Sequence, residues 1–237
     1  MNGKTDKTGN NLAIIPARGG SKRIPGKNIK SFFGKPIIVY SVETALKSEL
    51  FDEVMVSTDD KKIVDLALQY GAKVPFIRSE ENSNDQATIT DVLIEVIHQY
   101  ETNGHIFDNV CCILPTAPLI SNNRITEAYC KLINEKLDFV CPVVAFSYPI
   151  FRALEITKEN KLQLIWPEYQ SVRSQDLKTV YHDAGSFIWV KKTAILYEKT
   201  LFCRNGGAII LSEMEVQDID SETDWNLAEL KYKFLYG

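Results

Sequence analysis

Short apolar runs, separated by polar segments that contain Gly or Pro, recur along the chain from Leu12 onward. The runs typical of buried strands are 12–15, 53–57, 73–77, 110–114, 139–145 and 187–190. Between them, apolar residues at helical spacing predict helices over 36–48, 61–70, 89–100 and 124–135. Strands that alternate with helices favour right-handed β-α-β units. The pattern therefore predicts an α/β fold with a mainly parallel sheet.

One segment departs from this alternation. The runs 153–157 and 161–166 flank Lys158-Glu159-Asn160, which predicts a β-hairpin inside an excursion of about residues 150–180. An exposed hairpin edge is a natural surface for a second subunit, so we expect a homodimer. Residues 1–11 are polar and lack an apolar core, which predicts a disordered tail before a single domain over 12–237.

Composition limits the classes of function that fit. The 237 residues, 45% of them hydrophobic, suffice for one large domain with a proper core. A formal net charge of −4 gives no support to a nucleic-acid or membrane-surface partner, and no apolar run approaches the roughly 20 residues of a membrane helix. The cysteines are odd in number, with no Cys-x-x-Cys pair. We therefore expect reduced thiols in a cytoplasmic protein rather than disulfides or a zinc site.

The segment after the first strand carries the strongest chemical signal. It reads Pro-Ala-Arg-Gly-Gly-Ser-Lys-Arg-Ile-Pro-Gly-Lys-Asn over residues 16–28, and no Asp or Glu occurs from Leu12 to Val42. Glycines let backbone N–H groups approach an oxyanion, and cations neutralise its charge at the carboxyl end of a strand. A polyphosphate-binding loop is therefore favoured over a solvated basic loop. Adjacent Gly19 and Gly20 exclude the dinucleotide fingerprint, and Asn28 stands where a Walker A loop needs Ser or Thr.

Acidic residues gather near the other end of the chain, where no Lys or Arg occurs from Asn205 to Leu230. Alternation in Val-Gln-Asp-Ile-Asp, residues 216–220, places Asp218 and Asp220 on one face and turns Ile219 towards the core. We expect the two carboxylates to converge with no protein cation nearby, which suits Mg²⁺, an ion that prefers a few carboxylates and phosphate oxygens. The alternative is a solvated acidic run.

The next residues predict a C-terminal helix. Ser221 and Asp224 have the spacing of a capping box, which assigns the later acids to the start of the helix. Its apolar residues Leu227, Leu230 and Phe234 are expected to face inward.

Arg-Gly-Gly-Ser-Lys-Arg-Ile-Pro-Gly-Lys-Asn resembles the signature loop of the CMP-sugar synthetases, the cytidylyltransferases that activate nonulosonic acids such as sialic acid. Asp85–Thr88 and Pro-Thr-Ala-Pro-Leu, residues 115–119, extend the resemblance, although Asp85–Thr88 also fits a plain helix N-cap. The resemblance implies a Rossmann-like three-layer nucleotidyltransferase fold. It also implies that CTP is bound by Ala17, Arg18, Gly19, Gly20, Ser21, Lys22, Lys27, Asn28, Asp85, Thr88 and Thr116.

The polar segment 171–186 is expected to contact the sugar. Arg173 suits the sugar carboxylate, because a guanidinium binds a carboxylate with two parallel hydrogen bonds. Gln175 would read a hydroxyl or an amide, or lie on the surface; His182 and Asp183 would also address the sugar, with a structural role for His182 as the alternative. Arg-x-Gln-Asp and Tyr-His-Asp-Ala-Gly resemble the pseudaminic acid branch of the family more than the sialic acid branch.

The expected reaction is attack of the sugar's anomeric hydroxyl on the α-phosphorus of CTP, which forms a CMP-sugar and releases pyrophosphate. Arg18 and Lys27, together with Asp218 and Asp220 as ligands of Mg²⁺, would carry the catalysis. Synthetases for sialic, legionaminic or 3-deoxy-octulosonic acid are the nearest alternatives, and a non-catalytic nucleotide-binding module is an alternative from another class. The resemblance implies that the sugar is destined for a bacterial surface glycan or glycosylated flagellin.

Overall fold

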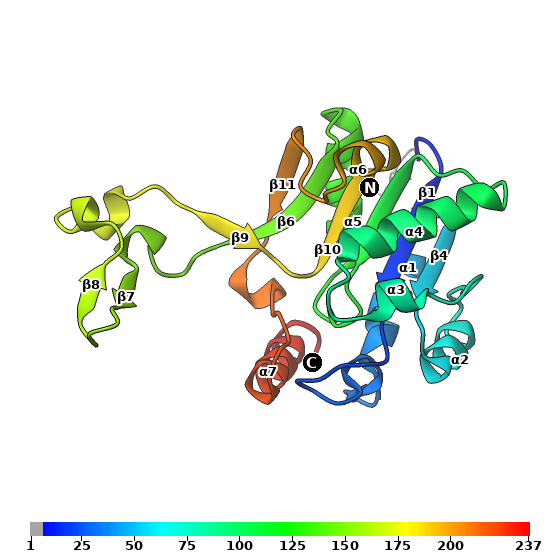
Figure 1. Cartoon of the computed structure of the whole chain (residues 1–237), viewed down its shortest axis with the longest axis horizontal. Coiled ribbons are helices and arrows are strands. Elements are labelled where there is room, and N and C mark those ends of the chain that lie inside the picture. Colours follow the sequence, from blue (N-terminus) through cyan, green and yellow to red (C-terminus); the bar gives the residue numbers. More distant parts are fainter. Residues whose placement is uncertain (1–6) are drawn as a thin grey trace.

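The computed structural model describes residues 7–237, which form a body around one central sheet and an arm that projects from the body (Figure 1). The sheet contains β1 (Asn11–Pro16), β4 (Glu53–Ser57), β5 (Asn109–Ile113), β6 (Phe139–Ala145), β9 (Tyr181–Asp183), β10 (Phe187–Lys191) and β11 (Gly206–Ile210). The α-helices are α1 (Ile37–Ser48), α2 (Lys61–Gln69), α3 (Glu80–Ser83), α4 (Ile89–Thr102), α5 (Asn122–Asn134), α6 (Lys192–Glu198) and α7 (Glu222–Tyr236).

The sheet is mainly parallel, with one antiparallel strand inserted. Its strand order is β11-β6-β10-β5-β1-β4, and β9 pairs with β6. β1 runs parallel to both β4 and β5, and β11 runs parallel to β6, whereas β10 is antiparallel to β5 and β6. The carboxyl ends of β1, β4 and β5 therefore share one edge of the sheet, where open α/β sheets bind their ligands.

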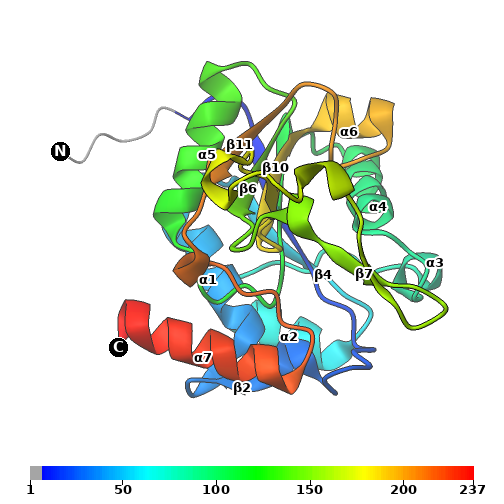
Figure 2. The same ribbon diagram turned by 90° about the vertical axis from the view of Figure 1, so that its left-hand side faces the viewer.

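Alternation along the strands builds two cores. In β1, Ala13 and Ile15 face the layer of α1, α2 and α5, whereas Leu12 and Ile14 face the layer of α4 and α6. Figure 2 shows the sheet between these helices. The three-layer α/β fold expected from the sequence is confirmed.

A third, smaller core joins the two ends of the chain. Ile24 of the basic loop packs in it with Ile219 and with Trp225 of α7. The short pair β2 (Ser31–Phe32) and β3 (Lys35–Pro36) adds Phe32, which is fully buried among aromatic rings. This core places the basic loop next to the Asp-Ile-Asp segment.

The strand predicted at 73–77 is wrong. Lys73 forms a single bridge with Met55, and the chain then leaves the sheet edge. Pro75 has no N–H to continue a ladder. The chain instead turns so that the Arg78 backbone N–H donates to the Thr58 carbonyl at 3.0 Å.

The inward face predicted for the C-terminal helix is also wrong. Leu230 and Phe234 are 65% and 75% exposed, and Leu227 is exposed as well. The capping box at Ser221 is present, but α7 packs through Trp225 and Ala228 instead. Packing of Trp225 in the aromatic core fixes which face of α7 is buried, so the stripe of Leu227, Leu230 and Phe234 faces outward.

The tail expected over residues 1–11 lies partly outside the described residues, and the rest is anchored to the body. The Thr8 backbone N–H donates to the Tyr129 hydroxyl at 2.8 Å. Asn11 already belongs to β1, and its side chain is buried and donates to the Leu50 carbonyl at 3.0 Å. The ordered chain therefore begins before residue 12.

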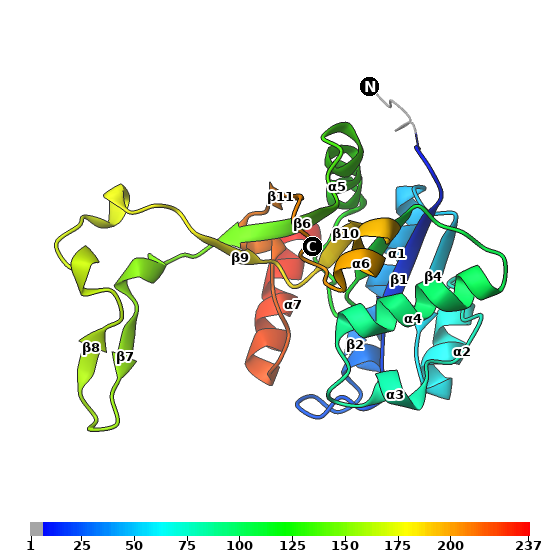
Figure 3. The ribbon, with the colours of Figure 1, turned by 45° about the horizontal axis from the view of Figure 1, so that its top comes forward.

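The arm, residues 148–180, extends away from the body in two views (Figures 1 and 3). It contains the predicted hairpin as β7 (Leu154–Ile156) and β8 (Leu162–Leu164), which pair only with each other. Short 3-10 turns complete it, and one of them is η4 (Ser174–Asp176). In the part of the chain that the structure describes, no helix is both long and apolar enough to cross a bilayer.

Candidate active site

The basic loop leaves β1 at the carboxyl edge of the sheet and is held by its own backbone and by the loop after β4. The Ala17 N–H donates to the Ser57 carbonyl at 2.9 Å, and the Asn28 side chain donates to the Arg18 carbonyl at 2.9 Å. The Gly19 N–H donates to Asp59 at 2.9 Å, and a Cβ at Gly19 would lie 2.6 Å from the Asp60 carboxylate. Glycine is therefore required there by close packing.

A cavity of about 520 Å³, here called the loop cavity, opens between this loop, the end of β5 and the Asp-Ile-Asp segment. Its lining includes eight of the predicted nucleotide, catalytic and metal residues: Arg18, Ser21, Lys22, Lys27, Asn28, Thr116, Asp218 and Asp220. The first and last of these residues, Arg18 and Asp220, are about 200 positions apart in the sequence, yet they line one space. The structure brings the basic loop and the acidic pair together at one cavity.

Each cation of the loop cavity is paired with an acid. Arg18 Nη1 lies 2.8 Å from Asp85, and Lys22 pairs with the same carboxylate. These two cations, Lys22 first, hold the pKa of Asp85 below its usual range. Asp85 therefore lies beside the basic loop, as a partner of its cations.

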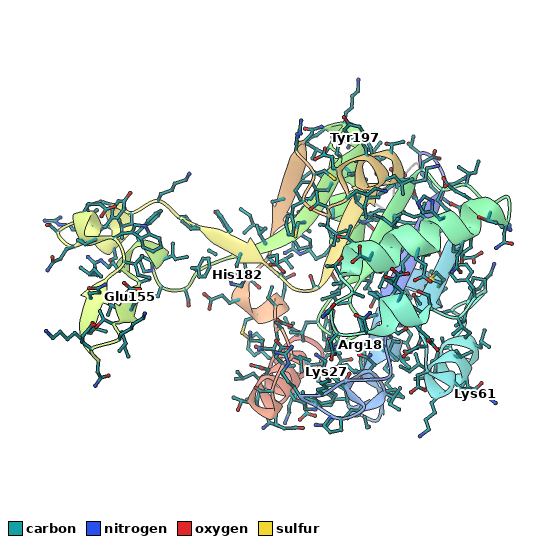
Figure 4. All side chains as sticks on the ribbon, viewed as in Figure 1. Arg18, Lys27, Lys61, Glu155, His182 and Tyr197 are labelled. Atoms are coloured by element: carbon teal, nitrogen blue, oxygen red, sulfur yellow. The ribbon has the colours of Figure 1, made fainter. Side chains whose placement is uncertain are left out.

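The expectation that no cation lies near the aspartate pair is wrong in three dimensions. Arg23 Nη2 lies 2.6 Å from Asp220 Oδ1, and Lys27 Nζ lies 3.6 Å from the same oxygen. Lys27 Nζ also donates to the Ile219 carbonyl at 2.6 Å. Figure 4 shows Arg18 and Lys27 entering this region from the basic loop. Side chains of the basic loop thus bind both a side chain and a backbone carbonyl of the acidic segment.

The aspartate pair has the predicted geometry. Ile219 is fully buried, whereas Asp218 and Asp220 both line the loop cavity. Desolvation by the cavity walls, and then the charge of Asp220, raise the pKa of Asp218. Gly185, with a left-handed φ of +56°, passes close enough that a Cβ would lie 3.5 Å from Asp218.

Two adjacent carboxylates of this kind fit a hard divalent cation that takes its other ligands from phosphate oxygens. Among residues 7–237, no group of three or more His, Cys, Asp or Glu side chains is placed to hold a metal by itself.

A second cavity, also about 520 Å³ and here called the arm-side cavity, lies on the other side of the aspartate pair. Asp218 and Asp220 line both cavities. His182 lines the arm-side cavity at the base of the arm, where its ring packs edge-on against Phe146 with centroids 4.8 Å apart. Its lining also includes Lys231 of α7. The aspartate pair therefore stands between two spaces, each large enough for part of a substrate.

A smaller hollow of about 150 Å³ adjoins the turn after β9. Cys112, Cys141, Leu201 and Phe202 give it mostly apolar walls, and Asp183, Gly185 and Ser186 lie at one side. The Ser186 hydroxyl is buried and has no hydrogen-bond partner among residues 7–237. An apolar hollow with one free hydroxyl suits a small substituent that has a methyl group and a polar atom.

Seven of the predicted site residues are not in the linings of these cavities. Ala17, Gly19 and Gly20 belong to the basic loop itself and Asp85 pairs with its cations, whereas Thr88, Arg173 and Gln175 lie elsewhere. The Thr88 hydroxyl is used in the capping box of α4 with Asp91, which is the plain-cap alternative. Arg173 and Gln175 lie in or beside η4 of the arm. Figure 4 shows how far the arm, marked by Glu155, projects from Arg18 and Lys27. Within one chain, the arm residues do not reach the aspartate pair.

The structure adds residues that the sequence analysis did not single out. Arg78 is buried, and its guanidinium donates to the Ser57 side chain at 3.0 Å and to the Ser57 carbonyl, which braces the end of β4 under the basic loop. Burial lowers the pKa of Arg78. Lys231 is the other addition, and it lies just beyond the stretch without Lys or Arg. No local pattern marks either residue, because both act through contacts distant in sequence.

Comparison with known proteins identifies similar chains. The cytidylyltransferase family model matches residues 12–222. The pseudaminic acid cytidylyltransferase of Campylobacter jejuni subsp. jejuni serotype O:23/36 is 43% identical over 223 residues, which cover 94% of this chain and 96% of the relative. The CMP-N,N'-diacetyllegionaminic acid synthase of Legionella pneumophila is 32% identical, over 92% of this chain and 94% of the relative.

Solved structures share the fold at lower sequence identity. CMP:2-keto-3-deoxy-manno-octonic acid synthetase complexed with CTP superposes with a TM-score of 0.69 at 19% identity, and the match covers 95% of this chain and 98% of that one. The 4-diphosphocytidyl-2C-methyl-D-erythritol synthase of Anaerococcus prevotii gives a TM-score of 0.64 at 15% identity, over 94% and 98% of the two chains. At these identities the likeness concerns the fold.

Proposed function

The chain belongs to the cytidylyltransferase family, and from that premise we propose that it transfers CMP from CTP to the anomeric hydroxyl of a nonulosonic acid, pseudaminic acid, with release of pyrophosphate. One observation carries the proposal. A glycine-rich basic loop and a pair of aspartates from the other end of the chain line one cavity at the carboxyl edge of the sheet. Such an arrangement suits a triphosphate that is bound directly on one side and through a divalent cation on the other.

Nucleotide binding requires an exchange of partners. The triphosphate competes with Asp85 for Arg18 and Lys22, and with Asp220 for Arg23 and Lys27. Each of the four cations keeps an anionic partner in this exchange, because it leaves a carboxylate and binds a phosphate oxygen. Ser21, Asn28 and Thr116 line the same cavity and supply polar groups for the nucleotide. Backbone groups of Ala17, Gly19 and Gly20 shape the turn.

Asp218 and Asp220 would hold Mg²⁺, which when bound neutralises phosphate charge and lowers the pKa of a coordinated hydroxyl. The protein's own contribution is to position the reactants. Lys27 and Arg18 hold the departing pyrophosphate, and the cavity walls align the sugar hydroxyl with the α-phosphorus.

The sugar occupies the arm-side cavity in this proposal. His182 lines this cavity beside the aspartate pair. Asp183 lines the apolar hollow next to Ser186, which accommodates a small substituent of the sugar that has a methyl group and a polar atom. Arg173 and Gln175 would bind the carboxylate and a polar substituent. Because the arm carries them away from their own cavity, they would serve the cavity of a second subunit.

The arm supports the proposal of a homodimer. β7 and β8 form an isolated two-stranded sheet, a structure that is marginal alone in water. The arm also exposes Leu154, Ile156 and Leu162. A second subunit would cover these side chains and bring its own arm to the first cavity. All five cysteines are free, which suits the reducing cytoplasm.

The choice of pseudaminic acid rests on relatives with that name, which are 43% identical over nearly the full chain. Legionaminic acid is the alternative, because the Legionella relative is named for its diacetyl derivative. A non-catalytic nucleotide-binding module is disfavoured by the aspartate pair, which a simple CTP binder does not need.

The test is a pyrophosphate-release assay with CTP, Mg²⁺ and pseudaminic, legionaminic or sialic acid offered side by side. We expect turnover with pseudaminic acid and none after Asp220→Ala, while circular dichroism shows a folded variant. Unchanged activity in that variant would refute the metal assignment. Absence of pyrophosphate with every sugar would refute the synthetase.

A further inference from the structure

The segment that bears the two aspartates has no regular secondary structure. Residues 216–220 lie between a 3-10 turn and α7 and form neither helix nor strand. Irregular backbone has no ladder of hydrogen bonds to fix its carbonyls, so a ligand pair built on it needs contacts from outside the segment.

Two lysines provide such contacts. Lys27 Nζ donates to the Ile219 carbonyl at 2.6 Å, and Lys231 Nζ donates to the Val216 carbonyl at 2.6 Å. One lysine comes from the basic loop and the other from α7. Together they hold the segment at two points, one on each side of Asp218.

We propose that Lys231 is a positioning residue for the metal-binding aspartates. It acts through the Val216 carbonyl rather than by touching CTP or the sugar, and it sets the direction in which the Asp218 carboxylate points. This role deepens the proposed function and depends on Asp218 and Asp220 being the metal ligands.

The helix that carries Lys231 is a firm support. Trp225 and Ala228 bury one face of α7, and Tyr236 at its end donates to the Leu119 carbonyl at 3.1 Å. At its start, Lys30 lies 2.7 Å from Glu222 and 4.3 Å from the centre of the Trp225 ring. A lysine on such a well-packed helix can fix the position of the backbone carbonyl to which it donates.

The surroundings of Lys231 are consistent with a tether, that is, a contact that holds residues 216–220 to α7. It lines the arm-side cavity with Asp218, Asp220, Asp224 and Glu213, and it is the one Lys or Arg in that lining. Asp224, two turns earlier on α7, accepts from the Asp220 backbone N–H at 3.1 Å. The same helix face therefore holds the segment at Val216, before the aspartate pair, and at the backbone of Asp220 itself. Without the lysine, the Val216 carbonyl would lose its donor and the segment would relax towards solvent.

The test compares Lys231→Met with Lys231→Arg, and uses Lys233→Met as the matched control, an exposed lysine two positions away on α7. Mn²⁺ binding is measured by electron paramagnetic resonance with CTP present and sugar absent, so that no turnover is needed. CTP binding without metal is measured by calorimetry, and kcat and KM follow from pyrophosphate release.

We expect Lys231→Met to weaken Mn²⁺ binding about tenfold, a typical effect of removing a group that orients metal ligands. Its metal-free affinity for CTP should stay within about twofold of wild type, because the basic loop is intact. Lys231→Arg should restore most of the metal affinity, and Lys233→Met should match wild type. The kcat of Lys231→Met should fall with an unchanged KM for the sugar.

Unchanged Mn²⁺ affinity in Lys231→Met would overturn the proposal, and so would a rise confined to the KM for the sugar, which indicates direct contact. A wild-type protein that does not bind Mn²⁺ with CTP would overturn it together with the metal assignment. A wild type that binds Mn²⁺ and CTP but releases no pyrophosphate would refute the proposed reaction alone, and the Lys231 comparison would still decide the tether.

Discussion

At the scale of single residues, the site holds a charged carboxylate, that of Asp218, which lowers the stability of the fold. Asp218 lies between two cavities, beside Asp220, and both desolvation and the neighbouring carboxylate raise its pKa. Its folded-state pKa is therefore above that of the unfolded chain, so the charged carboxylate costs stability at neutral pH. The proposed metal-binding role accounts for a carboxylate at this position.

We predict that Asp218→Asn raises the free energy of unfolding by about 0.5 kcal/mol at pH 7, a modest value because water screens part of the effect. Turnover should fall by a hundredfold or more, on the order expected for loss of a charge-stabilising group. The stability gain should fade as the pH falls through the folded pKa, because wild-type Asp218 becomes neutral as well. Urea unfolding of both proteins, from pH 7 down through the folded pKa of Asp218, measures the difference in stability. Asp65→Asn, on the exposed face of α2, is the control. An Asp218→Asn variant that is less stable than wild type at pH 7 would contradict the prediction.

At the scale of elements, the segment before the aspartates is anchored to α5. Glu215 in the 3-10 turn η5 (Glu213–Glu215) accepts from Arg124 Nε at 2.8 Å and from Nη2 at 3.1 Å. The Arg124 guanidinium is the main reason that the pKa of Glu215 falls to about 2, and Ser212 adds hydrogen bonds to the same carboxylate. The folded pKa is thus below the unfolded value of about 4.3.

We predict that Glu215→Gln lowers the free energy of unfolding by about 2 kcal/mol at neutral pH. A depressed pKa contributes stability above the unfolded pKa, and that contribution is lost as the pH falls through the folded pKa. The difference from wild type should therefore be full at pH 6 and shrink from about pH 4 towards pH 2. Urea denaturation from pH 7 to pH 3 measures it, and Glu213→Gln, an exposed neighbour, serves as the control. A difference that stays constant over this range would indicate lost packing rather than lost charge pairing.

At the scale of the whole molecule, the arm separates two groups of proposed site residues. The body holds the aspartate pair, whereas the arm holds Arg173 and Gln175 and projects away from it (Figure 3). One chain therefore contains all the proposed residues but does not assemble them. A dimer in which each arm reaches the other body would complete two sites.

This arrangement predicts complementation between inactive chains. Arg173→Ala and Asp220→Ala should each lose activity alone, because every site in either homodimer lacks one residue. Co-expression should restore about a quarter of wild-type activity, since about half of randomly assembled dimers are mixed and each has one complete site. Pyrophosphate release from the purified mixture measures it. No restoration, with mixed dimers verified by differential tags, would show that Arg173 acts within its own chain or not at all.

Local patterns determined much of this protein. Period-two and helical spacing predicted most strands and helices, and Gly19, the basic residues after it and the Asp218–Asp220 pair pointed to the two groups of residues that line the proposed site. These features depend on neighbours along the chain, which the sequence displays directly.

Tertiary structure decided what depends on contacts between distant residues. It inserted β10 antiparallel, ended the predicted strand at Lys73 and rotated α7 so that Trp225 rather than Leu230 is buried. It also brought Arg23 to Asp220 and Lys231 to Val216, and it carried Arg173 away on the arm. A side chain's partner is set by how whole elements pack, because burial and hydrogen bonding are satisfied over the folded molecule and not within a window of sequence.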